Sequence, residues 1–152
     1  MFFMKCENQF NYKEDKLMCD LTKNTIAIDF DGVIHKYSEG WKDGSIYDKP
    51  VKGVHESLMK LMNDYWVYIF TTRDVQEVVN WMNQKFWGEG SEMGFSTVAM
   101  PEGIRFWQGG RGRNVAVSNR KLPAEFYIDD RGIRFNGNWE ETLKEIKEIR
   151  GW

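Results

Sequence analysis

Apolar residues in this chain fall into short continuous runs that alternate with stretches of helical spacing. Continuous runs of this length are typical of strands buried on both faces of a sheet. Five of them predict strands, at residues 25–30, 66–70, 97–100, 115–117 and 125–128. Apolar positions three or four residues apart predict helices. These cover residues 53–64, 74–87 and 139–150, and a short extended piece is expected at 133–135.

Strands that alternate with helices indicate an α/β fold with a mostly parallel sheet and right-handed crossovers. The length of 152 residues suits one domain with a substantial core. Residues 1–23 are polar, show no clear periodicity and precede the first convincing strand. We therefore divide the chain into an N-terminal extension, 1–23, and one domain, 24–152.

Composition narrows the class of protein. The net charge of −2 gives no overall attraction to nucleic acid or to an anionic membrane, although it leaves nucleic acid open as a partner. No apolar run approaches the roughly 20 residues of a membrane span, and the N-terminus is apolar too briefly for a signal peptide. Cys6 and Cys19 suggest neither a zinc site nor a disulfide framework. We expect two free thiols in a cytoplasmic protein.

Four polar clusters follow the apolar runs or lie within one loop of them. They are Asp29-Phe30-Asp31-Gly32, Thr71-Thr72, Lys121 and Asp129-Asp130. In a parallel sheet the carboxyl ends of the strands share one edge, where ligands bind. We therefore expect these side chains to meet at one site.

The residue types at this edge suit a divalent cation and a phosphoryl group. Asp29 and Asp31 are two residues apart, so at a strand exit both carboxylates can face one pocket. Carboxylates held close together favour a bound cation or a shared proton, and Mg²⁺ prefers oxygen ligands. One Asp can then act as nucleophile and the other as general acid and base. Thr71 can donate a hydrogen bond to a phosphoryl oxygen, and Lys121 can neutralise developing charge.

Each cluster alone has an ordinary structural explanation. An Asp-x-Asp pair is common in turns and helix caps, threonine is a good strand residue, and a single lysine usually lies on the surface. The aromatic residues of the loop at 33–52 either cover the site or pack the loop onto the core; they are Tyr37, Trp41 and Tyr47. His35 either touches substrate or, as we favour, is structural or on the surface. The group of Arg105, Arg111, Arg113 and Trp107 is interpreted as a solvated loop, with contact to a phosphate-rich or nucleotide ligand as the alternative.

The chain resembles the haloacid dehalogenase-like hydrolase superfamily over about residues 25–150, because it contains these four clusters in this order. Ile28 to Val33 match the first motif, and Ile69 to Arg73 match the second. Lys121 stands at the place of the third, and Tyr127 to Asp130 match the fourth. The resemblance implies a Rossmann-like three-layer sandwich. The loops at 33–52 and 88–113 suggest a small member without a large cap domain.

The resemblance also implies residue roles. Asp29 would attack phosphorus to form an aspartyl-phosphate, and Asp31 would protonate the leaving oxygen and then activate water. Mg²⁺ would be held by the Asp29 carboxylate, the Asp31 main-chain carbonyl, and Asp129 or Asp130, with Asp130 favoured. Thr71 and Lys121 would hold the phosphoryl group, and Arg120 or Arg73 could share the role of Lys121. Remaining substrate contacts are expected from Gly32, Thr72, Arg73 and Trp41.

The sequence therefore predicts a Mg²⁺-dependent phosphatase for a small phosphorylated substrate. Three alternatives remain: action on nucleotide or polynucleotide phosphate ends, a catalytically silent binding module with the same fold, and a receiver domain of signalling. A receiver domain also gathers acids, a Thr and a Lys around Mg²⁺. It places its acidic pair first and its Lys last, however, whereas here Asp129-Asp130 follow Lys121.

Overall fold

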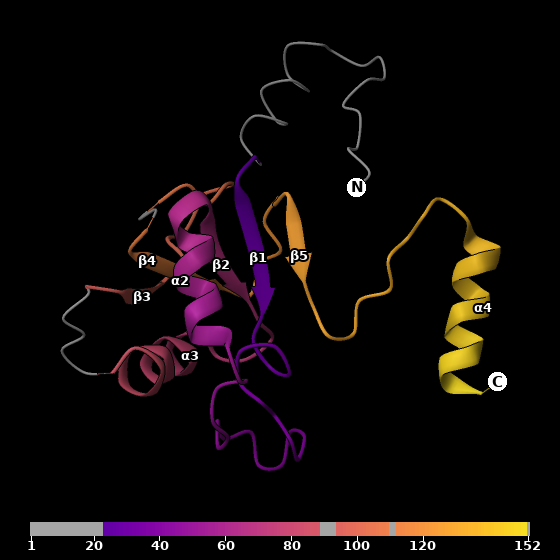
Figure 1. Ribbon diagram of the computed structural model, residues 1–152, viewed down its shortest axis with the longest axis horizontal. Coiled ribbons are helices and arrows are strands. Elements are labelled where there is room, and N and C mark those ends of the chain that lie inside the picture. The colour runs from indigo at the N-terminus through magenta and orange to yellow at the C-terminus, as the bar shows by residue number, and fades with distance from the viewer. Residues whose placement is uncertain (1–22, 89–93, 110–111, 152) are drawn as a thin grey trace, which may run out of the picture.

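The computed structural model describes residues 23–88, 94–109 and 112–151 (Figure 1). Apart from Lys23, the N-terminal extension lies outside the described residues, and so do both cysteines. Among the helices that are described, none has the length and apolar character needed to cross a membrane.

Five parallel strands form the single described sheet, in the order β3-β4-β2-β1-β5. The strands are β1 Thr25–Asp29, β2 Trp66–Phe70, β3 Ser96–Ala99, β4 Asn114–Ser118 and β5 Phe126–Ile128. Each differs from its predicted range by at most one residue at either end. The α/β class and the parallel sheet predicted from the sequence are confirmed.

The three predicted helices also form, with one irregularity. They are α2 Val54–Asp64, α3 Val75–Trp81 and α4 Trp139–Arg150, and α3 continues into a π-helical turn, η1 Met82–Phe86. The carboxylate of Asp74 accepts a hydrogen bond from the Glu77 backbone N–H at 3.0 Å and so caps the N-terminus of α3. At the start of α2, Gly53 adopts a φ of 82° that other residues rarely take.

The sheet has different covers on its two faces. On one face, α2, α3 and η1 pack against alternate strand residues, among them Ile28, Ile69 and Val117. On the other face, Ala27, Tyr68 and Ala116 pack against Trp107 and Leu122, which belong to irregular segments. The Tyr68 hydroxyl donates to the Leu122 carbonyl at 2.7 Å and accepts from the Leu122 N–H at 2.9 Å. In the described residues, the helical layer of the body therefore lies on one face only.

The C-terminal part departs from the sequence-based expectation. Helix α4 forms as predicted, but it lies apart from the sheet, and none of its residues is buried by the described chain (Figure 1). Its apolar residues Leu143 and Ile149 are therefore exposed. The extended piece expected at 133–135 is irregular and pairs with no described strand.

Candidate active site

The acidic residues meet at the carboxyl ends of two neighbouring strands. The arrows of β1 and β5 point to the same edge in Figure 1, and Ile28 is paired with Ile128 in the sheet. Asp29 ends β1, while Asp129 and Asp130 directly follow β5. One carboxylate oxygen from each of these three residues lies within 4.8 Å of the other two. The structure thus brings the first and fourth clusters together and offers a set of oxygen ligands suited to a hard divalent cation.

Gly32 allows Asp130 to approach this closely. Gly32 has a φ of 84°, in the left-handed region, and a Cβ at this position would overlap the Asp130 carboxyl group. The backbone N–H of Gly32 is bonded to the His35 carbonyl at 2.8 Å, so the turn cannot easily move away. The structure therefore gives Gly32 a steric role beneath Asp130.

Asp29 lies in an unfavourable place for a negative charge. Burial raises the pKa of Asp29 to about 6, the Phe30 backbone N–H opposes this shift, and the charges of Asp129, Asp130 and Asp31 add to it. The Phe30 N–H donates to Asp29 Oδ1 at 2.8 Å. A cation bound among the acids would compensate the repulsion, which is the condition that favours metal binding at a carboxylate cluster.

This raised pKa has a measurable consequence for stability without metal. The folded chain binds the Asp29 proton more tightly than the unfolded chain does, so the carboxylate destabilises the fold increasingly as pH rises from about 4 to about 6. Above pH 6 the charged carboxylate lowers the free energy of unfolding by an amount on the order of 2–3 kcal/mol. We expect Asp29→Asn in EDTA to be more stable than the wild type at neutral pH. Urea unfolding should show this advantage shrinking towards pH 4, and an advantage independent of pH would contradict the electrostatic explanation.

Asp31 is held between two buried side chains. Its Oδ1 accepts a hydrogen bond from His35 Nδ1 at 2.8 Å, and its Oδ2 accepts one from Arg73 Nε at 2.7 Å. His35 is fully buried, and its Nε2 accepts the Asp48 N–H at 2.9 Å, which places the ring proton on Nδ1. His35 is therefore structural, as interpreted from the sequence, and it fixes the orientation of Asp31. Each Asp31 oxygen retains a second lone pair for a proton or for water.

Arg73 joins Asp31 to the loop that contains Trp41. The Arg73 side chain is 2% exposed, and its Nη1 donates to the Gly44 carbonyl at 2.5 Å. The guanidinium lies 4.6 Å from the centre of the Trp41 ring, close enough for a cation–π interaction. Its Nη2 is buried and makes no hydrogen bond to any residue that the structure describes. The guanidinium therefore contacts Asp31, Gly44 and Trp41 within the protein, and its predicted contact with substrate stays a prediction.

We expect Arg73→Ala to destabilise the fold by roughly 3 kcal/mol, because it removes the partner of Asp31 in a largely buried ion pair and the hydrogen bond to the Gly44 carbonyl. Arg73→Lys should recover only part of this loss, since an ammonium lacks the fixed fork that reaches both acceptors. Chemical denaturation measures both effects. Lys42→Ala is the matched control in the same loop: its pair with Glu39 is exposed, and its loss should cost less than about 1 kcal/mol.

Threonines from the second cluster line the same pocket as the acids. This pocket has a volume of about 330 Å³, and its walls include Asp29, Asp31, Thr71, Thr72 and Asp129. The Thr71 hydroxyl oxygen accepts the Arg73 N–H at 3.1 Å, and its own proton stays available to donate. The size and polarity of the pocket are suitable for a phosphoryl group.

Lys121 has a different environment. Its Nζ lies 4.5 Å from the centre of the Tyr127 ring, and Lys121 is not among the residues that line the pocket. Arg120, its proposed substitute, reaches the Ile104 carbonyl instead. Arg131 does line the pocket, and its backbone N–H donates to Asp129 Oδ1 at 2.7 Å. Arg131 is therefore a cation at the site that the sequence-based interpretation missed.

Asn119 is a second residue at the site that sequence-based prediction missed. Its side-chain amide donates to the carbonyls of Thr71 and Arg73, at 2.6 and 2.7 Å. Asn119 directly follows β4, the strand beside β2, so the strand-end rule that identified Thr71 would also have identified it. These bonds fix the turn that presents Thr71 and Arg73.

The aromatic residues of the loop play different parts. The Tyr47 hydroxyl bonds within its own loop, to Glu39 and Gly40, and its ring packs 5.4 Å from that of His35, as core packing predicts. Trp41 is 52% exposed and lines the acidic pocket together with Tyr37. Tyr37 and Trp41 therefore line the acidic pocket, whereas Tyr47 packs the loop onto the core.

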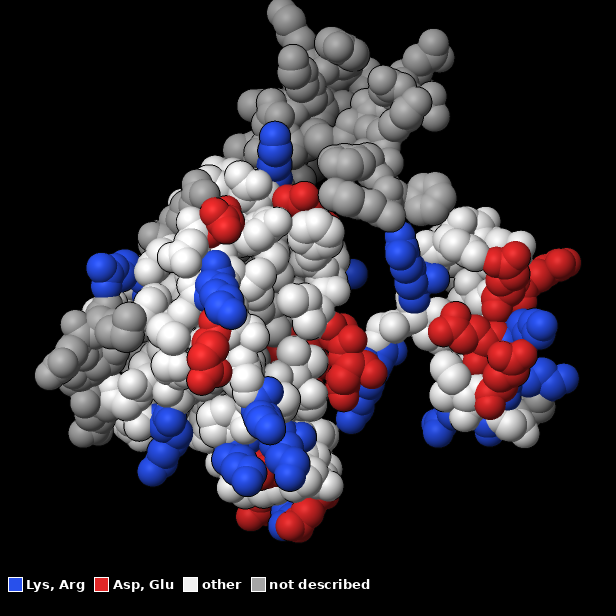
Figure 2. Space-filling view, viewed as in Figure 1, with Lys and Arg blue, Asp and Glu red and all other residues white. Residues whose placement is uncertain are grey.

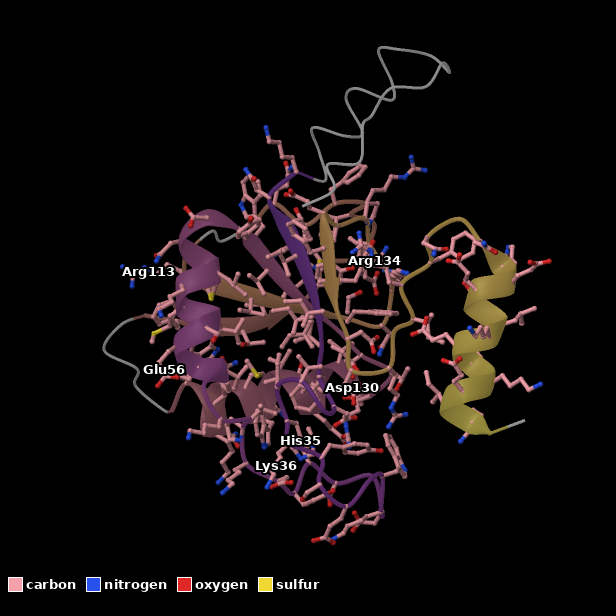
Figure 3. The ribbon with its side chains drawn as sticks, turned by 45° about the vertical axis from the view of Figure 1, so that its right-hand side comes forward. His35, Lys36, Glu56, Arg113, Asp130 and Arg134 are labelled. Carbon is pink, nitrogen blue, oxygen red and sulfur yellow. The ribbon has the colours of Figure 1, made fainter. Side chains whose placement is uncertain are left out.

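None of the described members of the predicted arginine group lines this pocket. Trp107 is buried against the sheet, and Arg113 directly precedes β4, at the amino-terminal edge of the strands. Figure 3 shows Arg113 on the opposite side of the body from Asp130 and His35. Arg111 lies outside the described residues.

Comparisons with protein families, curated proteins and solved structures found no match to this chain. The functional assignment therefore rests on the arrangement of the site itself.

Proposed function

We propose that the chain is a Mg²⁺-dependent phosphomonoester hydrolase of the haloacid dehalogenase-like superfamily, which acts through an aspartyl-phosphate. The observation that carries the proposal is the convergence of carboxylate oxygens of Asp29, Asp129 and Asp130 within 4.8 Å, where Asp29 and Asp129 line one pocket together with Thr71. Three carboxylates with a neighbouring hydroxyl donor suit a metal ion that binds a phosphate oxygen. The superfamily assignment also includes a Rossmann-like sandwich without a large cap domain, although in the described residues irregular segments, not helices, cover the second face of the sheet.

In this proposal an oxygen of Asp29 attacks phosphorus, and the bond from phosphorus to the ester oxygen breaks. Asp31 supplies a proton to the leaving oxygen and later removes one from the water that hydrolyses the acyl phosphate. Asp129 or Asp130, with the Asp31 main-chain carbonyl, would complete the Mg²⁺ ligands. Both acids belong to the cluster, so the choice between them stays open. Bound Mg²⁺ would supply charge neutralisation at the phosphoryl oxygens.

His35 and Arg73 support this role of Asp31. They hold its carboxylate at 2.8 and 2.7 Å from two buried side chains, so its orientation is set before substrate binds. A pre-oriented acid and base lowers the entropy lost in reaching the transition state. A silent binding module would need no such constraint on a residue beside the metal ligands.

The test is a phosphatase screen with Mg²⁺ against phosphorylated metabolites and oligonucleotides. We expect activity with Mg²⁺ that disappears in EDTA and returns when Mg²⁺ is added in excess, because the candidate ligands are carboxylate oxygens. Isothermal titration of Mg²⁺ into Asp129→Asn and Asp130→Asn would identify the direct ligand. Full activity in chelator, or hydrolysis dependent on zinc alone, would overturn the proposed mechanism.

A further inference from the structure

A second groove opens next to the acidic pocket. It has a volume of about 750 Å³ and lies between the loop at 41–46 and the helical segment formed by α3 and η1. Trp41 and Thr72 line both the groove and the acidic pocket. A substrate whose phosphate occupied the acidic pocket would therefore have the rest of its atoms next to this groove, at Trp41. We call this second cavity the Trp41 groove.

Trp41 forms a fixed wall at the junction of the two cavities. The Arg73 guanidinium lies 4.6 Å from its ring centre, and a Cβ on Gly44 would lie 3.3 Å from its Cζ2 atom. The cation–π contact with Arg73 orients the indole, Gly44 leaves room for it, and half of its surface remains exposed. A held aromatic surface suits the apolar face of a sugar ring or a nucleoside base, which can pack on it at little conformational cost.

Among the charged side chains of the Trp41 groove, acids outnumber cations. Asp43, Asp74 and Glu77 line it, whereas Lys85 is its one cation apart from Arg73. The charge of Arg73 is already paired with Asp31, at 2.7 Å. Backbone N–H groups of Ser45 and Glu77 hold the carboxylates of Asp43 and Asp74 in place. A phosphate that entered the groove would meet excess negative charge, while hydroxyl groups would find carboxylate acceptors.

The face shown in Figure 2 is consistent with this selectivity. Several Lys and Arg side chains gather at the lower end of this view, but no continuous basic track that would guide a polyanion runs across the described residues of the face.

We propose that the Trp41 groove receives the leaving group of the substrate and selects phosphate monoesters whose leaving group is neutral and carries hydroxyls. Leaving groups with a second phosphate are rejected. The inference rests on the proposed phosphatase function and adds the substrate class. Sugars and nucleosides share this chemistry, and the substrates used in the test distinguish them.

The test compares two pairs of substrates in the presence of Mg²⁺. Fructose 6-phosphate is paired with fructose 1,6-bisphosphate, and adenosine 5′-monophosphate with adenosine 3′,5′-bisphosphate. p-Nitrophenyl phosphate reports the chemistry alone. We expect at least one monophosphate to exceed its bisphosphate partner by about tenfold or more in kcat/KM, as one unfavourable charge contact of about 1.4 kcal/mol would give. The better monophosphate identifies the sugar or the nucleoside as the source.

Two variants locate the selectivity in the groove. Glu77→Lys should narrow the preference for monophosphate several-fold, and more so at low salt. Glu56→Lys is the matched control: it makes the same charge change on an exposed residue of α2 that does not line the groove, and it should leave the ratio unchanged. Trp41→Ala should reduce kcat/KM for the preferred monophosphate more than for p-nitrophenyl phosphate, because only the larger leaving group reaches the indole.

The outcomes separate the two proposals. No hydrolysis of any ester, including p-nitrophenyl phosphate, would overturn the phosphatase assignment and the substrate class with it. Hydrolysis of p-nitrophenyl phosphate with equal rates on monophosphates and bisphosphates would overturn the substrate class alone. Equal ratios of kcat/KM for monophosphate to bisphosphate in Glu77→Lys and Glu56→Lys would also overturn the substrate class.

Discussion

Asp29→Asn is expected to abolish phosphatase activity while the protein stays folded. An amide oxygen is a poor nucleophile, so no aspartyl-phosphate can form, and an amide is a weaker ligand for Mg²⁺ than a carboxylate. Asp29 accepts the Phe30 N–H at 2.8 Å, and an Asn oxygen can accept the same bond. The loss of activity should therefore occur without a loss of structure.

The measurement is steady-state turnover with Mg²⁺, together with circular dichroism and urea unfolding of the same preparation. Asp64→Asn serves as the control, because Asp64 is an exposed acid at the end of α2 and should keep full activity. Near-normal turnover by Asp29→Asn would exclude the covalent mechanism. If the metal-free variant is also stabilised at neutral pH, one residue carries both the electrostatic cost and the chemistry.

The sheet and its functional edge could be predicted from the sequence because they depend on local patterns. Continuous apolar runs such as Val67-Tyr68-Ile69 require burial on both faces, which only a central parallel strand provides. Once the strands are parallel, residues that follow them must share an edge, and this brought Asp29 and Asp129 together. Prediction succeeded where sequence neighbours determine the geometry.

The remaining features depend on contacts between residues far apart in the chain. Arg73 and Asp31 are separated by 42 residues, and no spacing rule indicates that the guanidinium turns inward to Asp31 and Gly44. Similarly, the apolar spacing of α4 predicts a helix but not its position, and the helix lies away from the sheet. The position of the Lys121 side chain could not be predicted either, because Lys121 lies in a loop and its direction depends on the contact with the Tyr127 ring.

Asp31→Asn should lower turnover by roughly 10²–10⁴-fold, the usual contribution of a positioned general acid and base. The change affects two steps, protonation of the leaving oxygen and deprotonation of the attacking water. The main-chain carbonyl of residue 31 is retained, so Mg²⁺ binding should largely survive. The structure adds a second effect: His35 and Arg73 both donate to Asp31, whereas an Asn side chain has only one acceptor oxygen. We therefore also expect a loss of about 1–3 kcal/mol in the free energy of unfolding.

These two effects can be separated with a substrate that has a good leaving group. p-Nitrophenolate leaves with little need for a proton donor, so Asp31→Asn should still form the aspartyl-phosphate from p-nitrophenyl phosphate. Hydrolysis of this aspartyl-phosphate should remain slow. Acid-quenched protein should then carry an extra mass of about 80 Da, one phosphoryl group, and peptide mapping should place it on Asp29. His35→Gln, which removes the imidazole from Asp31 but leaves its carboxylate, should lower stability without accumulating this intermediate. Phosphate on a different aspartate, or normal turnover in Asp31→Asn, would contradict the assignment of Asp29 as nucleophile and Asp31 as its acid and base.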